Sequence, residues 1–322
     1  MEGYISPSIA SALAMVIRTR CVFCLAIIWF ADFANAHNDR SCLLAAGVGS
    51  WEHGRFTPSA SESYHDFFKD LPPQQKPRIF MIGDSINREM VKGACRRVGM
   101  QAERYLKCDS DGSGFACLYE RFELANLFFF GTDLDATFPK HAWSSTGSGP
   151  GGHRCDDLPL DTRGRFEITN LRRAMTHLTG EPDVVVVSAM LWVLQHIQDT
   201  HTTWSTFFSD RAALSSFSIE YVHNMTYLVR AAQAAYPRAR FFIQKLPGAA
   251  NVQGRLIGPD SVRHINKLAH VAAYLAGGVC VLDLEEMAHS AAGIVVIDND
   301  GRHPTHEFSM EVINMLLNIA VV

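Results

Sequence analysis

Short apolar runs alternate with longer amphipathic segments along most of the chain. The apolar runs are typical of buried strands, and they predict strands at residues 78–82, 127–130, 183–188, 240–244, 279–282 and 294–297. The segments between them have helical periodicity and predict helices at residues 86–98, 165–178, 212–235, 261–276 and 306–320. This alternation predicts an α/β fold, a three-layer α/β/α sandwich around a mostly parallel, flavodoxin-like sheet. Functional residues of such sheets lie just after the strands, at their carboxyl ends.

The first 36 residues have the order of a secretory signal peptide. Arg18 and Arg20 precede an apolar run at 21–33, and small residues at 34–36 predict cleavage before His37. An uncleaved signal anchor is the alternative, but it would place both arginines near the bilayer centre at about 2.5–3.5 kcal/mol each. We therefore favour cleavage, which predicts a secreted protein; an anchor would keep it in the Golgi lumen and in contact with a membrane.

The rest of the chain divides into two parts. Residues 37–77 are polar with scattered aromatic residues and end in a proline-rich stretch, which predicts an N-terminal extension. Residues 78–322 contain the alternating pattern and predict a single domain. The composition is that of a globular protein, with 48% hydrophobic residues and a formal net charge of -4. Because no long basic run is present, we expect no nucleic-acid partner.

Cysteine usage fits an oxidising compartment. The chain has eight cysteines, and removal of residues 1–36 leaves six, an even number suited to disulfides. Cys108 and Cys117 bracket a polar loop and are candidates for a short bridge, while the other pairings stay open and free thiols are the alternative. Asn224 begins the one glycosylation sequon, which has meaning only in the secretory pathway.

A serine stands where the first strong strand meets its helix, in the sequence Gly83-Asp84-Ser85. A serine there displays its hydroxyl at the sheet edge, beside helix amides that have no partner within the helix and can stabilise an oxyanion. The position also suits a helix cap. Asn87 and Arg88 follow on the same turn and are candidate substrate-binding residues.

A serine nucleophile needs a base, and the base needs an orienting carboxylate. Asp300 and His303 form the one Asp-x-x-His spacing in the chain. They follow the last apolar run, at 294–297, which we expect to be the final strand of the sheet. That position predicts that they share a sheet edge with Ser85, although a plain surface turn would have the same spacing.

Together these blocks resemble the SGNH (GDSL-type) hydrolases, and more narrowly the PC-esterase branch that includes the plant trichome-birefringence-like proteins. The resemblance covers residues 78–322 and implies an SGNH-hydrolase fold with Ser85 as nucleophile, His303 as general base and Asp300 as its orienting residue. It implies hydrolysis or transfer of O-acyl groups, chiefly acetyl groups, on a glycan or small acyl-ester substrate. We expect no cofactor and no metal ion.

One block departs from the family pattern. Where relatives have Asn and Gly after the central strand, this chain has Ser188-Ala189-Met190, followed by Trp192 as a further substrate-binding candidate. The candidates for the oxyanion site are therefore the Ser85 amide, Gly131 and Ser188. Loss of one oxyanion donor costs about 100- to 1000-fold in rate. The altered block fits a slow or specialised enzyme, or an SGNH-fold protein that has lost catalysis and binds a partner.

Two metal-dependent alternatives rest on weaker patterns. Asp133-Leu134-Asp135 and Asp298-Asn299-Asp300 have the Asp-x-Asp spacing with which Golgi glycosyltransferases hold a metal-bound sugar nucleotide. His196, Asp199 and His201 form a small cluster of possible metal ligands without a further strong ligand nearby. Both patterns are common by chance, so we prefer the serine esterase or acyltransferase.

Overall fold

The computed structural model describes residues 40–60, 64–69, 75–105, 114–128, 177–188, 194, 210–248, 259–291, 295–299 and 303–322. Within them, seven strands form the central sheet in the order β4-β5-β6-β3-β7-β8-β9. Their bounds are β3 (Arg78–Gly83), β4 (Glu103–Arg104), β5 (Phe115–Leu118), β6 (Glu123–Phe128), β7 (Val184–Ser188), β8 (Arg240–Gln244) and β9 (Val279–Leu282). The five strands from β6 to β9 run parallel, and β4 and β5 pair antiparallel at one edge.

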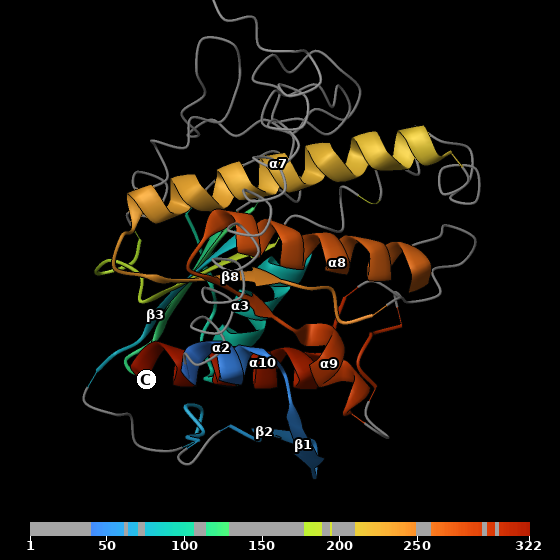
Figure 1. Cartoon of the computed structure of the whole chain (residues 1–322). Helices are drawn as coiled ribbons and strands as arrows, with labels where there is room; N and C mark the ends of the chain where they lie inside the picture. Colours follow the sequence, from blue (N-terminus) through green and yellow to red (C-terminus); the bar gives the residue numbers. More distant parts are fainter. Residues whose placement is uncertain are drawn as a thin grey trace, which may run out of the picture.

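Helices cover both faces of this sheet, as Figure 1 shows, so the molecule is the predicted three-layer α/β/α sandwich. The helices are α2 (Arg40–Ala45), α3 (Ser85–Arg97), α7 (Arg211–Ala235), α8 (Pro259–Ala276), α9 (Leu284–His289) and α10 (His306–Val321). Helices α7 and α8 lie on one side, and α2, α3 and α10 lie on the other. The chain builds outward from β3 in opposite directions, and right-handed crossovers then place the helices on opposite faces.

The apolar runs found most of the parallel strands and missed the two antiparallel strands at one edge. The predictions for β3, β7, β8 and β9 are confirmed to within one residue, because these strands are continuous apolar segments. The run at 127–130 marks only the end of β6, which begins at Glu123. The short strands β4 and β5 at the edge have no such run. The predicted helix at 165–178 lies almost entirely outside the described residues.

The predicted final strand at 294–297 is wrong in its described part. Ile297 forms only an isolated antiparallel bridge with Pro304, and β9 is the last strand of the sheet. The backbone here bonds within its own turn, since the Asp298 amide donates to the His303 carbonyl at 2.8 Å and the Thr305 amide to the Val296 carbonyl at 2.8 Å. The described part of the apolar run at 294–297 therefore belongs to a local turn that leads into α10, and not to a strand of the sheet.

Two disulfides link the described elements. Cys95, in the last turn of α3, is bonded to Cys117 on β5, with 5.5 Å between their Cα atoms. Cys42 on α2 is bonded to Cys280 on β9, with 5.3 Å between Cα atoms. The predicted Cys108–Cys117 bridge is therefore wrong, because α3 packs over β5 and brings Cys95 to Cys117 instead. Cys108 itself lies outside the described residues.

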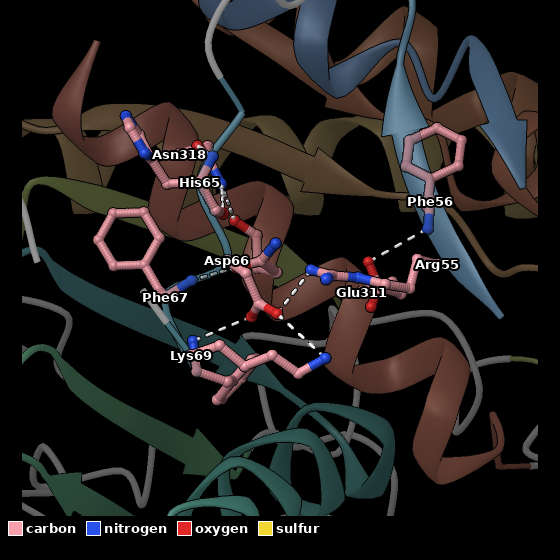
Figure 2. Close-up of polar contacts among 10 residues, drawn as sticks. Arg55, Phe56, His65, Asp66, Phe67, Lys69, Glu311 and Asn318 are labelled. Carbon is pink, nitrogen blue, oxygen red and sulfur yellow. Dashed lines mark hydrogen bonds and ion pairs between the residues drawn. The ribbon is translucent and has the colours of Figure 1, made fainter. Parts of the chain in front are cut away.

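The N-terminal segment is attached to α10 through one polar face of that helix (Figure 2). Asn318 exchanges two hydrogen bonds of 2.9 Å with the backbone of His65, and Asn314 accepts one of 3.0 Å from the Phe67 amide. Glu311 accepts from the Phe56 amide at 3.2 Å. These three α10 residues recur every three or four positions and so share one helix face. The segment also supplies buried aromatic side chains, so part of the core lies before residue 78.

A buried carboxylate lies at the amino ends of the parallel strands, on the side of the sheet opposite their carboxyl ends. Glu123 is fully buried at the start of β6, where Lys76 Nζ lies 2.9 Å away and the Thr179 amide donates at 2.8 Å. Burial alone would raise the pKa of Glu123, but the hydrogen bonds from Thr179 and Lys76 outweigh it and hold the pKa below its ordinary value. The folded state therefore favours the ionised form of the Glu123 carboxylate.

We expect Glu123→Gln to lower the free energy of unfolding by about 1–3 kcal/mol at neutral pH, since hydrogen bonds to a charged group are lost. The folded pKa is depressed, so this contribution is complete above about pH 4.3 and disappears as the pH falls through the folded pKa. Urea unfolding at pH 7 and at acidic pH measures both effects. Glu120→Gln, at a side chain that is 73% exposed, is the matched control and should change little.

Candidate active site

The turn between β3 and α3 presents Ser85 at the carboxyl edge of the sheet. Strand β3 ends at Gly83, and α3 begins at Ser85. Asp84 between them caps the helix, because its carboxylate accepts from the Ile86 amide at 2.9 Å. The Asp84 side chain is fully buried, and Ser85 is 7% exposed. Ser85 is therefore held at a helix N-terminus in a defined position.

Close packing beneath this turn requires a glycine at position 83. A Cβ atom there would lie 1.9 Å from Asn87 Oδ1 and 2.8 Å from the Ser188 carbonyl oxygen. Gly83 also pairs in register with Phe128 of β6 and Ser188 of β7, the neighbours on either side of β3. The connection that follows β3 leads to the β6 side of the sheet, and the connection that follows its neighbour β7 leads to β8 on the other side. This is the topological switch point at which open α/β sheets place their ligands.

His303 meets Ser85 at this position. Its Nε2 atom lies 2.7 Å from Ser85 Oγ, although the two residues are 218 positions apart in the sequence. His303 belongs to the turn closed by the Ile297–Pro304 bridge, and Thr305 then caps α10. With the ring proton on Nδ1, Nε2 is an acceptor for the serine hydroxyl. The pair thus has the arrangement in which a histidine can take a proton from a serine.

Of the other residues expected in the triad and the oxyanion site, only some lie within the described residues. Asp300, Gly131 and Trp192 lie outside the described residues. The Ile86 amide is already bonded to Asp84, so it is not free for an oxyanion. Ser188 ends β7 with its hydroxyl fully buried and without a hydrogen-bond partner among the described residues. The Ser85 amide, in the first turn of α3, is the remaining candidate donor among the described residues.

Asn87 and Arg88 differ in how they relate to the site. Asn87 has no exposed surface, and its Nδ2 donates to Gln244 Oε1 at 2.9 Å, across to the carboxyl end of β8. Because Asn87 is buried and bonded to Gln244, it supports the turn between β3 and α3 from inside the protein. The Arg88 side chain is 12% exposed, and its Nε lies 3.1 Å from Glu89 Oε1. Burial alone would raise the pKa of Glu89, but Lys92 and Arg88 lower it overall.

Gln244 is a site residue that the sequence reasoning missed. It is fully buried at the end of β8 and holds Asn87, and through it the first turn of α3. Its Nε2 atom and Asn87 Oδ1 have no partner among the described residues. The available signal was a glutamine at the end of an otherwise apolar strand, at the same edge as Ser85.

A second serine and histidine also touch, but their geometry differs. Ser218 Oγ lies 2.9 Å from His264 Nε2 between α7 and α8. The Ser218 hydroxyl donates to the Leu214 carbonyl at 2.7 Å, so His264 can only donate to it. Ser218 also lies inside α7, where helix amides are already bonded. This pair lacks both features that make Ser85 a candidate nucleophile.

Several other residues predicted from the sequence lie on α7 or outside the described residues. Asn224 lies inside α7, with the sequon's Thr226 only 8% exposed, and not in an exposed loop. His196, Asp199, His201, Asp133 and Asp135 lie outside the described residues. Within the described ranges, no group of three or more acidic, histidine or cysteine side chains is arranged to hold a metal ion. No described helix is both long and apolar enough to cross a membrane.

Comparison with known proteins finds similar solved structures only. No protein-family model and no curated protein sequence matches this chain. A family 2 carbohydrate esterase with a carbohydrate-binding domain from Corynascus thermopiles (Myceliophthora fergusii) matches with a TM-score of 0.38 and 14% identity, over 78% of this chain and 68% of that one. A GDSL-like lipase from Bacteroides thetaiotaomicron matches with a TM-score of 0.38 and 12% identity, over 77% and 90%.

A carbohydrate acetylesterase from Sinorhizobium meliloti has a TM-score of 0.35 and 13% identity, over 76% of this chain and 97% of its own. The structural neighbours are thus GDSL-like lipases and carbohydrate esterases. Their similarity to this chain is distant, so the function has to be argued from the site itself.

Proposed function

We propose that this protein is a serine esterase of the SGNH type that acts on O-acyl esters, chiefly O-acetyl groups, of glycans. The single observation that carries the proposal is the 2.7 Å contact between Ser85 Oγ and His303 Nε2 at the N-terminus of α3. A serine, a base and helix amides meet there at the carboxyl edge of a mostly parallel sheet. The similar solved structures include a carbohydrate esterase and a GDSL-like lipase, enzymes with ester chemistry of this kind.

The reaction begins when Ser85 Oγ attacks the acyl carbonyl carbon and His303 Nε2 takes the hydroxyl proton. The Ser85 amide donates to the oxyanion that forms, and we assign to Asp300, which lies outside the described residues, the role of orienting the His303 ring. Collapse of the tetrahedral intermediate breaks the ester bond, and His303 gives the proton to the leaving sugar oxygen, which departs as a hydroxyl. The acyl group then remains on Ser85 until water, or a second sugar hydroxyl, attacks it with His303 again as base.

A transient acyl-enzyme is the direct test of this sequence of steps. Rapid quenching of the protein with a small acetyl ester, followed by intact-mass measurement, should reveal one acetyl group per chain. Added sugar alcohols then separate the two outcomes, because a transferase gives acetylated sugar and a hydrolase gives acetate. Absence of the adduct together with absence of ester cleavage would favour an SGNH-fold binding protein, which the buried hydroxyl of Ser188 also fits.

We also propose that the protein is exported. Disulfides persist in oxidising compartments, and the described residues contain two of them, Cys42–Cys280 and Cys95–Cys117. Two disulfides fit the signal peptide expected at residues 1–36, and Cys42–Cys280 joins the extension proposed at 37–77 to the domain proposed at 78–322. N-terminal sequencing of the secreted protein tests cleavage before His37, and a mass shift on deglycosylation tests Asn224.

Gln244 should act as a positioning residue in this reaction. We expect Gln244→Leu to lower kcat about tenfold and leave KM nearly unchanged, because Asn87 would lose its partner and the turn that carries Ser85 would loosen. Gln233→Leu, on the surface of α7, is the matched control. If Asn87 and Gln244 act together, their leucine variants will be non-additive in kcat. If Gln244→Leu instead lowers the amount of folded protein and leaves kcat unchanged, the role of Gln244 is purely structural.

A further inference from the structure

A trough between α7 and α8 has the composition of a ligand site and lies apart from Ser85. Its volume is about 580 Å³, within the usual range for small-molecule sites. Apolar side chains from both helices make its walls: Ile219, Val222, Leu268, Val271 and Leu275. Ile219 is 70% exposed, Val271 46% and Leu275 45%. A contiguous cluster of large, exposed apolar side chains often marks an interaction site.

The two helices run side by side along this trough. Ser218 meets His264 at one end, and Arg230 Nη2 donates to the Leu275 carbonyl at 2.7 Å at the other. The lining residues of α7 are at positions 218, 219, 222, 223, 226 and 230, which lie on one face of the helix and form one continuous stripe. At 1.5 Å per residue, the stripe is about 18 Å long. The trough therefore suits an extended chain better than a compact ring.

The charges of the trough are asymmetric. None of the lining residues in the described part of the chain is acidic. Arg230 lies at one end, and His223 is the other titratable residue among them. The bond to the Leu275 carbonyl holds the guanidinium in place and uses one of its five N–H donors. A fixed guanidinium suits a carboxylate or phosphate, which it can bind through two parallel hydrogen bonds. Thr226, which also lines the trough, has a buried hydroxyl with no partner among the described residues.

We propose that this trough binds a single-chain amphiphile with an anionic head, such as a fatty carboxylate. The alkyl chain would lie along the apolar walls and the head would bind Arg230. Apolar walls with a guanidinium at one end, and no carboxylate among the described lining residues, fit this ligand and disfavour a cationic amphiphile. The proposal does not depend on the reaction assigned to Ser85.

Isothermal titration of the purified protein with dodecanoate, below its micelle concentration, tests the site. We expect saturable binding that weakens about tenfold in Arg230→Gln, the effect of one or two charge-assisted hydrogen bonds. Val271→Asp should abolish it. Arg211→Gln, on the same helix but outside the trough, should bind as the unchanged protein does. Both trough substitutions are at exposed positions, so thermal unfolding should show an unaltered fold.

Several outcomes would overturn the proposal. These are no saturable heat, equal binding of dodecyltrimethylammonium, or full binding by Arg230→Gln. A dimer in light scattering that Val271→Asp dissociates would instead assign the trough to a second copy of the chain. Flotation with neutral phosphatidylcholine vesicles that is insensitive to Arg230→Gln would assign it to a membrane surface. Ester cleavage measured in Arg230→Gln should stay unchanged, which keeps this test separate from the one on Ser85.

Discussion

Replacement of Ser85 by alanine should reduce kcat/KM for a small acetyl ester by at least about a thousandfold. Removal of the nucleophile of a serine triad leaves only the catalysis that comes from binding and oxyanion stabilisation. The folded state should be nearly unaffected, because the helix cap is the Asp84 side chain and not Ser85. The measurement is initial-rate hydrolysis with the purified variants, accompanied by thermal unfolding.

Ser218→Ala is the matched control for this prediction. Ser218 also lies within hydrogen-bond distance of a histidine, but its hydroxyl donates to the Leu214 carbonyl. We expect its rate to equal that of the unchanged protein. His303→Ala should resemble Ser85→Ala, because the two side chains act in the same step. A Ser85→Ala variant that retains more than a tenth of the activity would show that another residue carries the reaction.

The Cys42–Cys280 disulfide should make the largest single contribution to stability. It joins residues 238 positions apart, so it restricts the unfolded chain over most of the domain. The chain-entropy relation gives about 5 kcal/mol for a loop of this size. We expect Cys42→Ala with Cys280→Ala to lower the free energy of unfolding by an amount near this value. Guanidinium unfolding under non-reducing conditions measures it.

The second disulfide supplies an internal comparison. Cys95 and Cys117 close a separation of only 22 residues, for which the same relation gives about 3 kcal/mol. The double alanine variant at Cys95 and Cys117 should therefore be the more stable of the two. Equal losses would indicate that the bridges act through the folded state, because loop length would then have no influence.

The sequence predicted the parallel strands of the sheet better than its antiparallel edge. Strands β3, β7 and β8 are buried on both sides, so their sequences are apolar without interruption and easily found. Strand β5 is short and lies near the edge, where no such run is needed. The apolar run at 294–297 is equally conspicuous but leads into a local turn. Apolar content alone does not distinguish these two outcomes.

The sequence predicted those parts of the candidate site that follow from the order of strands and helices along the chain. Ser85 follows the first strand, and an α/β pattern is enough to place it at the carboxyl edge. His303 reaches Ser85 even though the strand expected before it is absent, because its turn enters α10 beside α3. Gln244 and the pairing of Cys95 depend on which helix packs over which strand. Such contacts between distant segments are not contained in local periodicity.

The central claim is that Ser85 is a nucleophile activated by His303, and covalent labelling tests it most directly. The purified protein should react with a serine-directed phosphonate to give one adduct per chain, and peptide mapping should place it on Ser85. His303→Ala should label at least about a hundredfold more slowly, because the hydroxyl has lost its base. An unlabelled protein, or an adduct on Ser218 or any other residue in its place, would contradict the assignment.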